Sequence, residues 1–188
     1  IAAVVQGVTS NYDTDLLRAL VDETARIAGK SYGGTLDPSD VSMRVVADHM
    51  RAMTFLIADG VVPSNEHRGY VLRKIMRRAM RHAHILGTRE PNMFNLVGAL
   101  AKEMGEAYPE LIRAQPAIES AFSQEEQSFQ RTLGRGLALL DEATATLGKG
   151  GVLAGDVAFK LYDTFGFPLD LTQDVLRGRE MTVDEAGY

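Results

Sequence analysis

Hydrophobic residues recur along the chain at intervals of three and four, and strict alternation of apolar and polar residues is scarce. Such intervals predict amphipathic helices rather than strands. The expected fold class is therefore mainly α: a helical bundle with one long helix and one arginine-striped helix, and at most minor short β elements. The predicted helices cover about 14–28, 39–59, 65–86 and 92–105, a long segment after Pro116, 156–161 and 169–177.

The long segment after Pro116 carries an apolar stripe at helical spacing. Its members are Phe122, Phe129, Leu133, Leu137, Leu140 and Leu147. Gly134 and Gly136 lie inside the segment and cost about 1 kcal/mol each relative to Ala, so they permit either close packing or a kink. The following Gly-rich stretch, 148–151, lacks the spacing of a phosphate-binding loop, and we interpret it as a flexible connector.

The two ends suggest a piece of a longer protein. The chain opens on apolar residues 1–5 without Met or a capping residue, as if a helix were already under way. Near the other end, Thr182 and Glu185 have the spacing of a capping box, which predicts the start of a helix. We expect one recognition fragment, 1–188, with two candidate sub-modules at 1–108 and 109–188.

Composition narrows the class of protein. The 188 residues are 45% hydrophobic and 24% charged, which is an ordinary globular balance. No apolar run approaches 18 residues, so no membrane partner is expected. Cysteine is absent, which excludes disulfides and favours the cytoplasm. The four histidines form no convincing ligand set, and we expect no metal or cofactor in these residues.

Positive charge is concentrated on one predicted helix. Seven of the 20 Lys and Arg residues fall between positions 67 and 89, where there is no Asp or Glu, although the net charge is −5. At helical spacing Arg73, Arg77 and Arg81 share one side with Lys74 and Arg78, opposite an apolar arc. This pattern predicts a basic stripe that faces outward. The stripe could be solvated and paired with acids of another helix, or it could bind phosphate, which suits the planar fork of Arg.

Three long segments give a more specific signal than composition. They read IAAVVQGVTSNYDTDLL (1–17), RVVADHMRAMTFLIADGVVPSNEHRGYVLRKIMRRAMRHAHILG (44–87) and FKLYDTFGFPLDLTQDVL (159–176). They resemble, in order and over essentially the whole chain, the region that follows the catalytic core in the alanyl-tRNA synthetase family.

The resemblance implies the middle, tRNA-recognition region of a class II, ATP-dependent alanine–tRNA ligase. Such an enzyme uses ATP and Mg to activate alanine and then transfers it to tRNA. Its adenylation motifs would precede Ile1, and a zinc-containing editing region would follow Tyr188. The fragment itself would hold no catalytic residue, and its partners would be the tRNA(Ala) acceptor stem and the N-terminal catalytic domain in cis.

The family identifies its tRNA chiefly by a G·U wobble pair in the acceptor stem. The minor groove of A-form RNA is open to side chains, and the guanine amino group there is a donor that Asn or Asp can accept from. By resemblance the base readers are Asn65, at the start of the basic helix, and Asp163, in the aromatic turn 162–168. From the residues alone, Asn65 or Ser64 could equally cap that helix, and Asp163 could cap the next helix or close an Asx-turn.

The basic stripe would then bind the RNA backbone and supply salt-dependent affinity rather than base specificity. We assign this role to six side chains, with Arg77 first among them: Arg68, Arg73, Lys74, Arg77, Arg78 and Arg81. Two alternatives stay open. The helices could mainly buttress the catalytic domain, or form a generic DNA-binding module, although the latter would place base-reading side chains along the exposed helix face.

Overall fold

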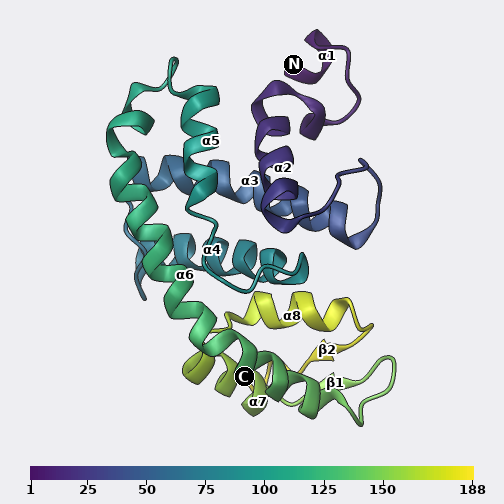
Figure 1. Ribbon diagram of the computed structural model, residues 1–188. Helices are drawn as coiled ribbons and strands as arrows, with labels where there is room; N and C mark the ends of the chain where they lie inside the picture. The colour runs from purple at the N-terminus through teal and green to yellow at the C-terminus, as the bar shows by residue number, and fades with distance from the viewer. The chain divides into compact units, whose positions relative to one another are not determined.

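The structure is a computed structural model that describes residues 1–188. It is mainly α, as predicted (Figure 1). The elements in order are α1 (Ala2–Val5), η1 (Asn11–Asp13), α2 (Asp15–Ala28), α3 (Pro38–Ala58), α4 (His67–Ile85), α5 (Asn95–Met104), α6 (Pro109–Thr144), β1 (Val152–Leu153), α7 (Gly155–Phe165), α8 (Leu169–Arg177) and β2 (Thr182–Val183). No helix is both long and apolar enough to cross a membrane.

The chain forms two compact units, Ile1–Glu126 and Gln127–Tyr188, and α6 runs through both. The sub-modules 1–108 and 109–188 stay a prediction, and the compact units divide within α6 rather than before it. The reason lies in the apolar stripe, which already begins at Leu111 and Ile118, both fully buried. Because these side chains are buried, the helix continues on both sides of Pro116. Pro116 is exposed and lies inside α6, whereas the sequence predicted a helix that begins after it.

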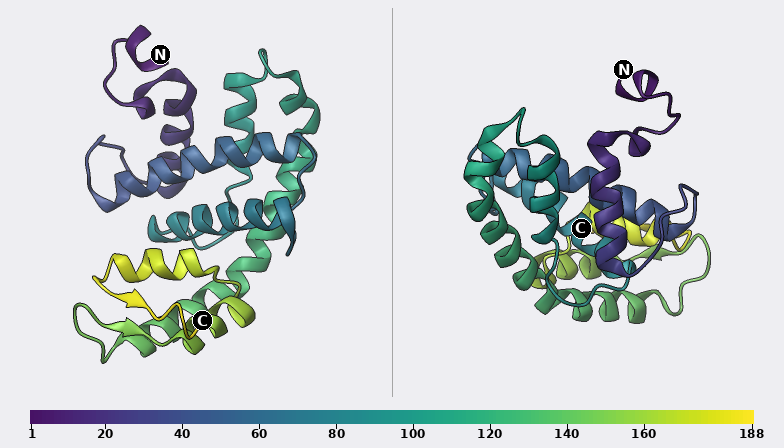
Figure 2. Two further views of the ribbon diagram at one scale, coloured as in Figure 1. Left: turned by 180° about the vertical axis from the view of Figure 1, so that it is seen from behind. Right: turned by 45° about the horizontal axis from the view of Figure 1, so that its top comes forward.

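In the first unit α3 and α4 lie side by side, and α2 and α5 pack on α3 and on each other (Figure 2). Methionine is prominent in the core of this unit: Met43, Met50 and Met53 of α3 and Met76 of α4 have no exposed surface. Met43, Val46, Met50, Met53 and Ile57 recur at helical spacing on one side of α3, and all of them except the half-buried Ile57 are buried. The apolar arc predicted for α4 is also confirmed, since Leu72, Met76, Ala79, Met80 and Ala83 are buried. An unbranched thioether side chain fills irregular gaps between crossing helices well.

In the second unit α7 packs against α8, and the C-terminal part of α6 contacts the end of α7 and Phe167. Gly136 is explained by close packing rather than a kink: a Cβ atom there would lie 2.5 Å from the ring of Phe167. Phe167 in turn packs on Phe129, with ring centroids 5.7 Å apart. Gly134, two residues earlier, meets no atom within 4 Å. The other core side chains are Leu133, Leu140, Leu153, Ala158, Leu161, Leu171, Val175 and Leu176.

Two predictions about the C-terminal third are wrong. The capping box at Thr182 starts no helix: Thr182–Val183 is strand β2, which pairs in parallel with β1. The amide of Thr182 donates to Gly151 O at 3.0 Å, so the backbone pairs with the glycine segment instead of starting a helical turn. Gly150 also donates to Glu180 O at 2.8 Å. The Gly-rich stretch is thus hydrogen-bonded to Glu180 and Thr182, and it is not the flexible connector that the sequence predicted.

Candidate nucleic-acid interface

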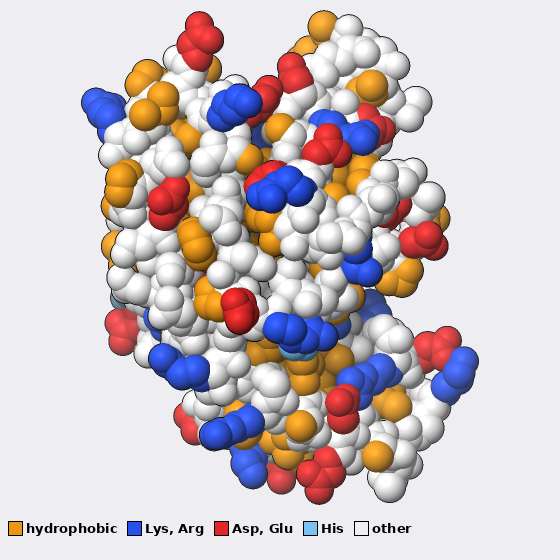
Figure 3. Space-filling view, in the orientation of Figure 1, with side chains coloured by type: hydrophobic (Ala, Val, Ile, Leu, Met, Phe, Trp, Pro, Cys, Tyr) orange, Lys and Arg blue, Asp and Glu red, His pale blue; other side chains and the backbone are white.

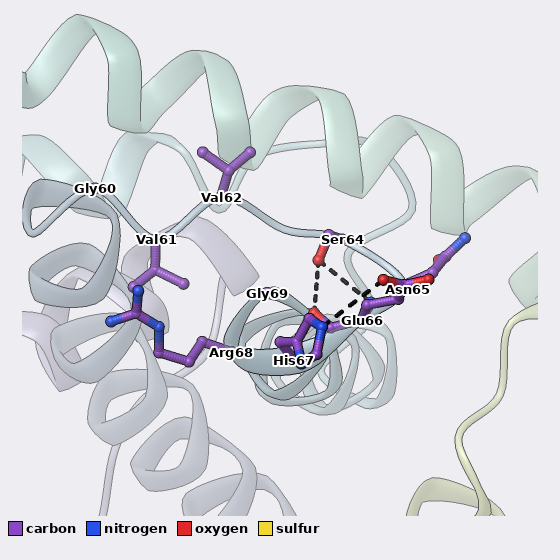
Figure 4. Close-up of a pocket in the computed structure, with 9 residues that line it drawn as sticks. All are labelled: Gly60, Val61, Val62, Ser64, Asn65, Glu66, His67, Arg68 and Gly69. Atoms are coloured by element: carbon purple, nitrogen blue, oxygen red, sulfur yellow. Dashed lines mark hydrogen bonds and ion pairs between the residues drawn. The ribbon is translucent and has the colours of Figure 1, made fainter.

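The residues before and at the start of α4 line an open groove of about 430 Å³. Figure 4 shows its lining, in which Asn65 and Arg68 extend in opposite directions from the helix start. The backbone folds back tightly here, because a Cβ atom at Gly69 would lie 2.3 Å from both Ser64 Oγ and Val62 O. Only glycine at position 69 permits this approach.

Neither Asn65 nor Ser64 caps α4 in the way that the sequence allowed. The N-cap residue is Glu66, without a side-chain capping bond, and Ser64 Oγ instead donates to Glu66 O at 2.8 Å. His67 begins the helix with a φ of 51°, a left-handed conformation that is uncommon outside glycine. Asn65 is exposed, and its Oδ1 accepts a hydrogen bond from Arg73 Nη1.

Arg73 and Arg77 share one acidic partner, Glu125 of α6. Arg73 Nε donates to Glu125 Oε2 at 3.1 Å, and Arg77 Nε donates to Glu125 Oε1 at 2.8 Å. The Glu125 side chain is only 6% exposed, and the two arginines are 22% and 15% exposed. Two of the five stripe residues, Arg73 and Arg77, therefore do not simply face outward, and the alternative of pairing with acids of another helix is confirmed for these two.

The other four predicted backbone-binding side chains differ in exposure. Arg68 is exposed and lines the groove, whereas Lys74, Arg78 and Arg81 are partly buried along α4. The Lys74 ammonium lies 5.7 Å from the centre of the Tyr70 ring, a cation–π distance. On the face of the molecule seen in Figure 3, Lys and Arg side chains are interspersed with Asp and Glu.

Asp163 belongs to the second unit, whereas Asn65 belongs to the first. Asp163 lies in the last turns of α7, because that helix continues past Leu161 to Phe165 and replaces the predicted aromatic turn. The helix extension is held by Thr132 Oγ1, which donates to Phe165 O at 2.9 Å. Asp163 is exposed and caps no helix. The neighbouring Tyr162 ring packs against Phe159 and Tyr188.

Two buried acids, Glu125 and Glu126, are the residues that sequence reasoning missed. Glu126 is 1% exposed, and its carboxylate accepts the amide of Met93 at 3.1 Å. Burial raises the pKa of Glu126 to about 7, although backbone hydrogen bonds from Asn92 and Met93 oppose the rise. The sequence did contain a signal for their burial, because both acids fall on the apolar stripe of the long helix. Glu125 and Glu126 lie three and four residues after Phe122, and four and three residues before Phe129.

Comparisons with known proteins show the family of the chain. A family model described as tRNA synthetases class II (A) matches residues 1–188, so the chain belongs to that family. The particular relatives are alanine–tRNA ligases. Those of Hyphomonas neptunium, Caulobacter vibrioides and Sphingopyxis alaskensis are 61%, 59% and 57% identical over 188 residues. The chain covers 21% of each of these proteins.

Proposed function

We propose that the chain is the middle, tRNA-recognition region of an alanine–tRNA ligase and that it reads the G·U pair of the tRNA(Ala) acceptor stem from the minor groove. The observation that supports this proposal most directly is the exposure of the two predicted base readers. Asn65 and Asp163 are both exposed, and neither is used as a helix cap. The helix-capping roles that compete with base reading are thus not taken up by either side chain.

The chemistry of the two readers suits a minor groove. The Asp163 carboxylate can only accept, as the free amino group of a wobble guanine requires. The Asn65 amide offers both donors and an acceptor. Arg68, Lys74, Arg78 and Arg81 are proposed contacts to the RNA backbone, and Arg73 and Arg77 would bind it in competition with Glu125.

The full-length protein is proposed to join alanine to tRNA(Ala) with ATP and Mg, in a catalytic domain that precedes this chain. A zinc-containing editing region is proposed to follow it. Both expectations rest on the similarity to alanine–tRNA ligases.

A second candidate function is mechanical support of the catalytic domain with only non-specific RNA contacts. The exposed apolar side chains at the first residues favour it, since Ile1, Val4 and Val5 are 104%, 83% and 79% exposed. The pairing of Arg73 and Arg77 with Glu125 also fits a supporting role.

The test compares Asn65→Ala and Asp163→Ala in the full-length protein with acceptor stems that carry G·U or G·C. Each variant is expected to lose about 5- to 150-fold of the preference for G·U, because a good base-edge contact contributes about 1–3 kcal/mol of discrimination. Asn95→Ala and Asp156→Ala, exposed positions at the first turns of α5 and α7, serve as matched controls. Unchanged preference in both reader variants would leave the supporting role as the better account.

A further inference from the structure

We propose that Arg73 and Glu125 are positioning residues for Asn65, which they hold in one orientation for base reading. This inference rests on the proposed function, since it concerns how the same site is built. All three residues belong to the first unit.

The connection is continuous through one guanidinium group. Arg73 Nη1 donates to Asn65 Oδ1, and Arg73 Nε donates to Glu125 Oε2 at 3.1 Å. The second carboxylate oxygen, Oε1, accepts Arg77 Nε at 2.8 Å, so the carboxylate is held from both sides and cannot rotate freely. The base reader on the loop is thereby tied to the middle of α6.

The environment strengthens this connection. Glu125 is 6% exposed, and Arg73 is 22% exposed, whereas Asn65 at the end of the chain of bonds is open to solvent. Charge-assisted hydrogen bonds that are largely shielded from water are stronger and better ordered than those at a free surface. Buried Glu125 therefore holds Arg73 in place, and Arg73 in turn holds the exposed Asn65 side chain where RNA can reach it.

The arrangement also decides which way the Asn65 amide points. Arg carries donors only, so the group that faces it must be Oδ1 and not the amide nitrogen. This leaves Nδ2, with two donors, and one lone pair of Oδ1 available to the minor groove. Without Arg73 the amide could turn over, and its donors and acceptor would exchange places.

The role differs from a phosphate contact in what it predicts. A backbone contact changes affinity for every stem alike, whereas a positioning residue changes the ratio between G·U and G·C stems. Arg77 offers a matched control, because it shares Glu125 with Arg73 and its Nε binds the other carboxylate oxygen. Both Arg→Met variants remove one cation from the same carboxylate.

The experiment measures binding of G·U and G·C acceptor stems to the full-length protein with Arg73→Met, Arg77→Met, Glu125→Gln and Asn65→Ala. Arg73→Met and Glu125→Gln are expected to reduce the G·U preference about 5- to 10-fold, within the range of one base-edge contact. Arg77→Met is expected to weaken both stems equally. In the Asn65→Ala background, Arg73→Met should reduce the preference no further, because it acts through that residue.

The outcomes separate the two proposals. If Asn65→Ala leaves the preference intact, base reading by Asn65 fails and this inference fails with it. If Asn65→Ala removes the preference while Arg73→Met does not, or if the Arg73 and Asn65 effects simply add, only the positioning role is overturned. Circular dichroism and thermal unfolding of each variant show that the compared proteins are folded.

Discussion

Arg73 and Glu125 lie 52 positions apart in sequence, and their side chains meet in an ion pair of 3.1 Å. The same carboxylate also holds Arg77, so two cations on one side of α4 share a single buried acid. Neighbouring arginines at helical spacing repel each other slightly. The shared carboxylate offsets this repulsion and links α4 to α6.

Removal of Glu125 should therefore destabilise the fold. Glu125→Ala leaves two poorly solvated guanidinium groups without their acid, and we expect a loss of about 2 to 4 kcal/mol in the free energy of unfolding. Denaturant titration of the full-length protein measures the change. Glu142→Ala, at an exposed position of the same helix, is the control and should change the free energy by less than about 0.5 kcal/mol. Equal effects of the two variants would show that the ion pair contributes nothing.

Glu126 predicts a dependence of stability on pH. Its pKa in the folded protein is raised to about 7, so the folded state binds more protons than the unfolded state between its ordinary pKa near 4.5 and pH 7. Stability contributed by protonated Glu126 is then fully present below about pH 4.5 and lost as the pH rises to about 7, a total of roughly 3 kcal/mol.

Glu126→Gln should remove that dependence, because glutamine keeps an acceptor for the Met93 amide but does not titrate in this range. Above pH 7 the variant is expected to be more stable than the natural protein. Unfolding curves at a series of pH values test this. A natural protein whose stability does not fall between pH 5 and 7 relative to the variant would contradict the buried titration.

The glycine pair in α6 separates close packing from helix propensity. Gly136→Ala places a methyl group 2.5 Å from the Phe167 ring, which must then shift, and we expect a loss of about 1 to 3 kcal/mol. Gly134→Ala meets nothing within 4 Å and should stabilise the helix by about 0.5 to 1 kcal/mol. Opposite signs in thermal unfolding are the expected result, and two stabilising substitutions would show that Phe167 adapts without cost.

His67 holds a backbone conformation that suits glycine. Its φ is 51° and its side chain is 90% exposed, so a substitution changes backbone strain without loss of packing. His67→Gly is expected to raise the free energy of unfolding by about 0.5 to 1 kcal/mol, and His67→Val to lower it by about 1 kcal/mol. If the free energy of unfolding of His67→Val equalled or exceeded that of His67→Gly, position 67 would not be in the left-handed conformation.

Local signals in the sequence were sufficient for several elements. The predicted helix 169–177 coincides with α8, and the helix predicted to end at Ala28 does so before the left-handed Gly29. The apolar arcs of α3 and α4 were readable because burial follows the helical period. These features depend on neighbours within one or two turns.

Features that depend on distant partners were not predictable. Thr182 forms a strand rather than a helix start because it pairs with Val152. Pro116 lies within a helix because Leu111 and Ile118 on either side of it are buried. At the site, the position and exposure of Asn65 follow from the start of α4. Its bond to Arg73, and the bond of Arg73 to Glu125, require the packing of α4 against α6.

The most direct test of the central claim is binding of this chain alone to two acceptor-stem hairpins that differ only in a G·U or G·C pair, over a series of salt concentrations. A helical circular dichroism spectrum first shows that the isolated chain is folded. The account predicts tighter binding of the G·U hairpin at every salt concentration, with affinity that falls steeply as salt increases for both hairpins. Equal affinity for the two hairpins would contradict the claim that the base readers act within these 188 residues.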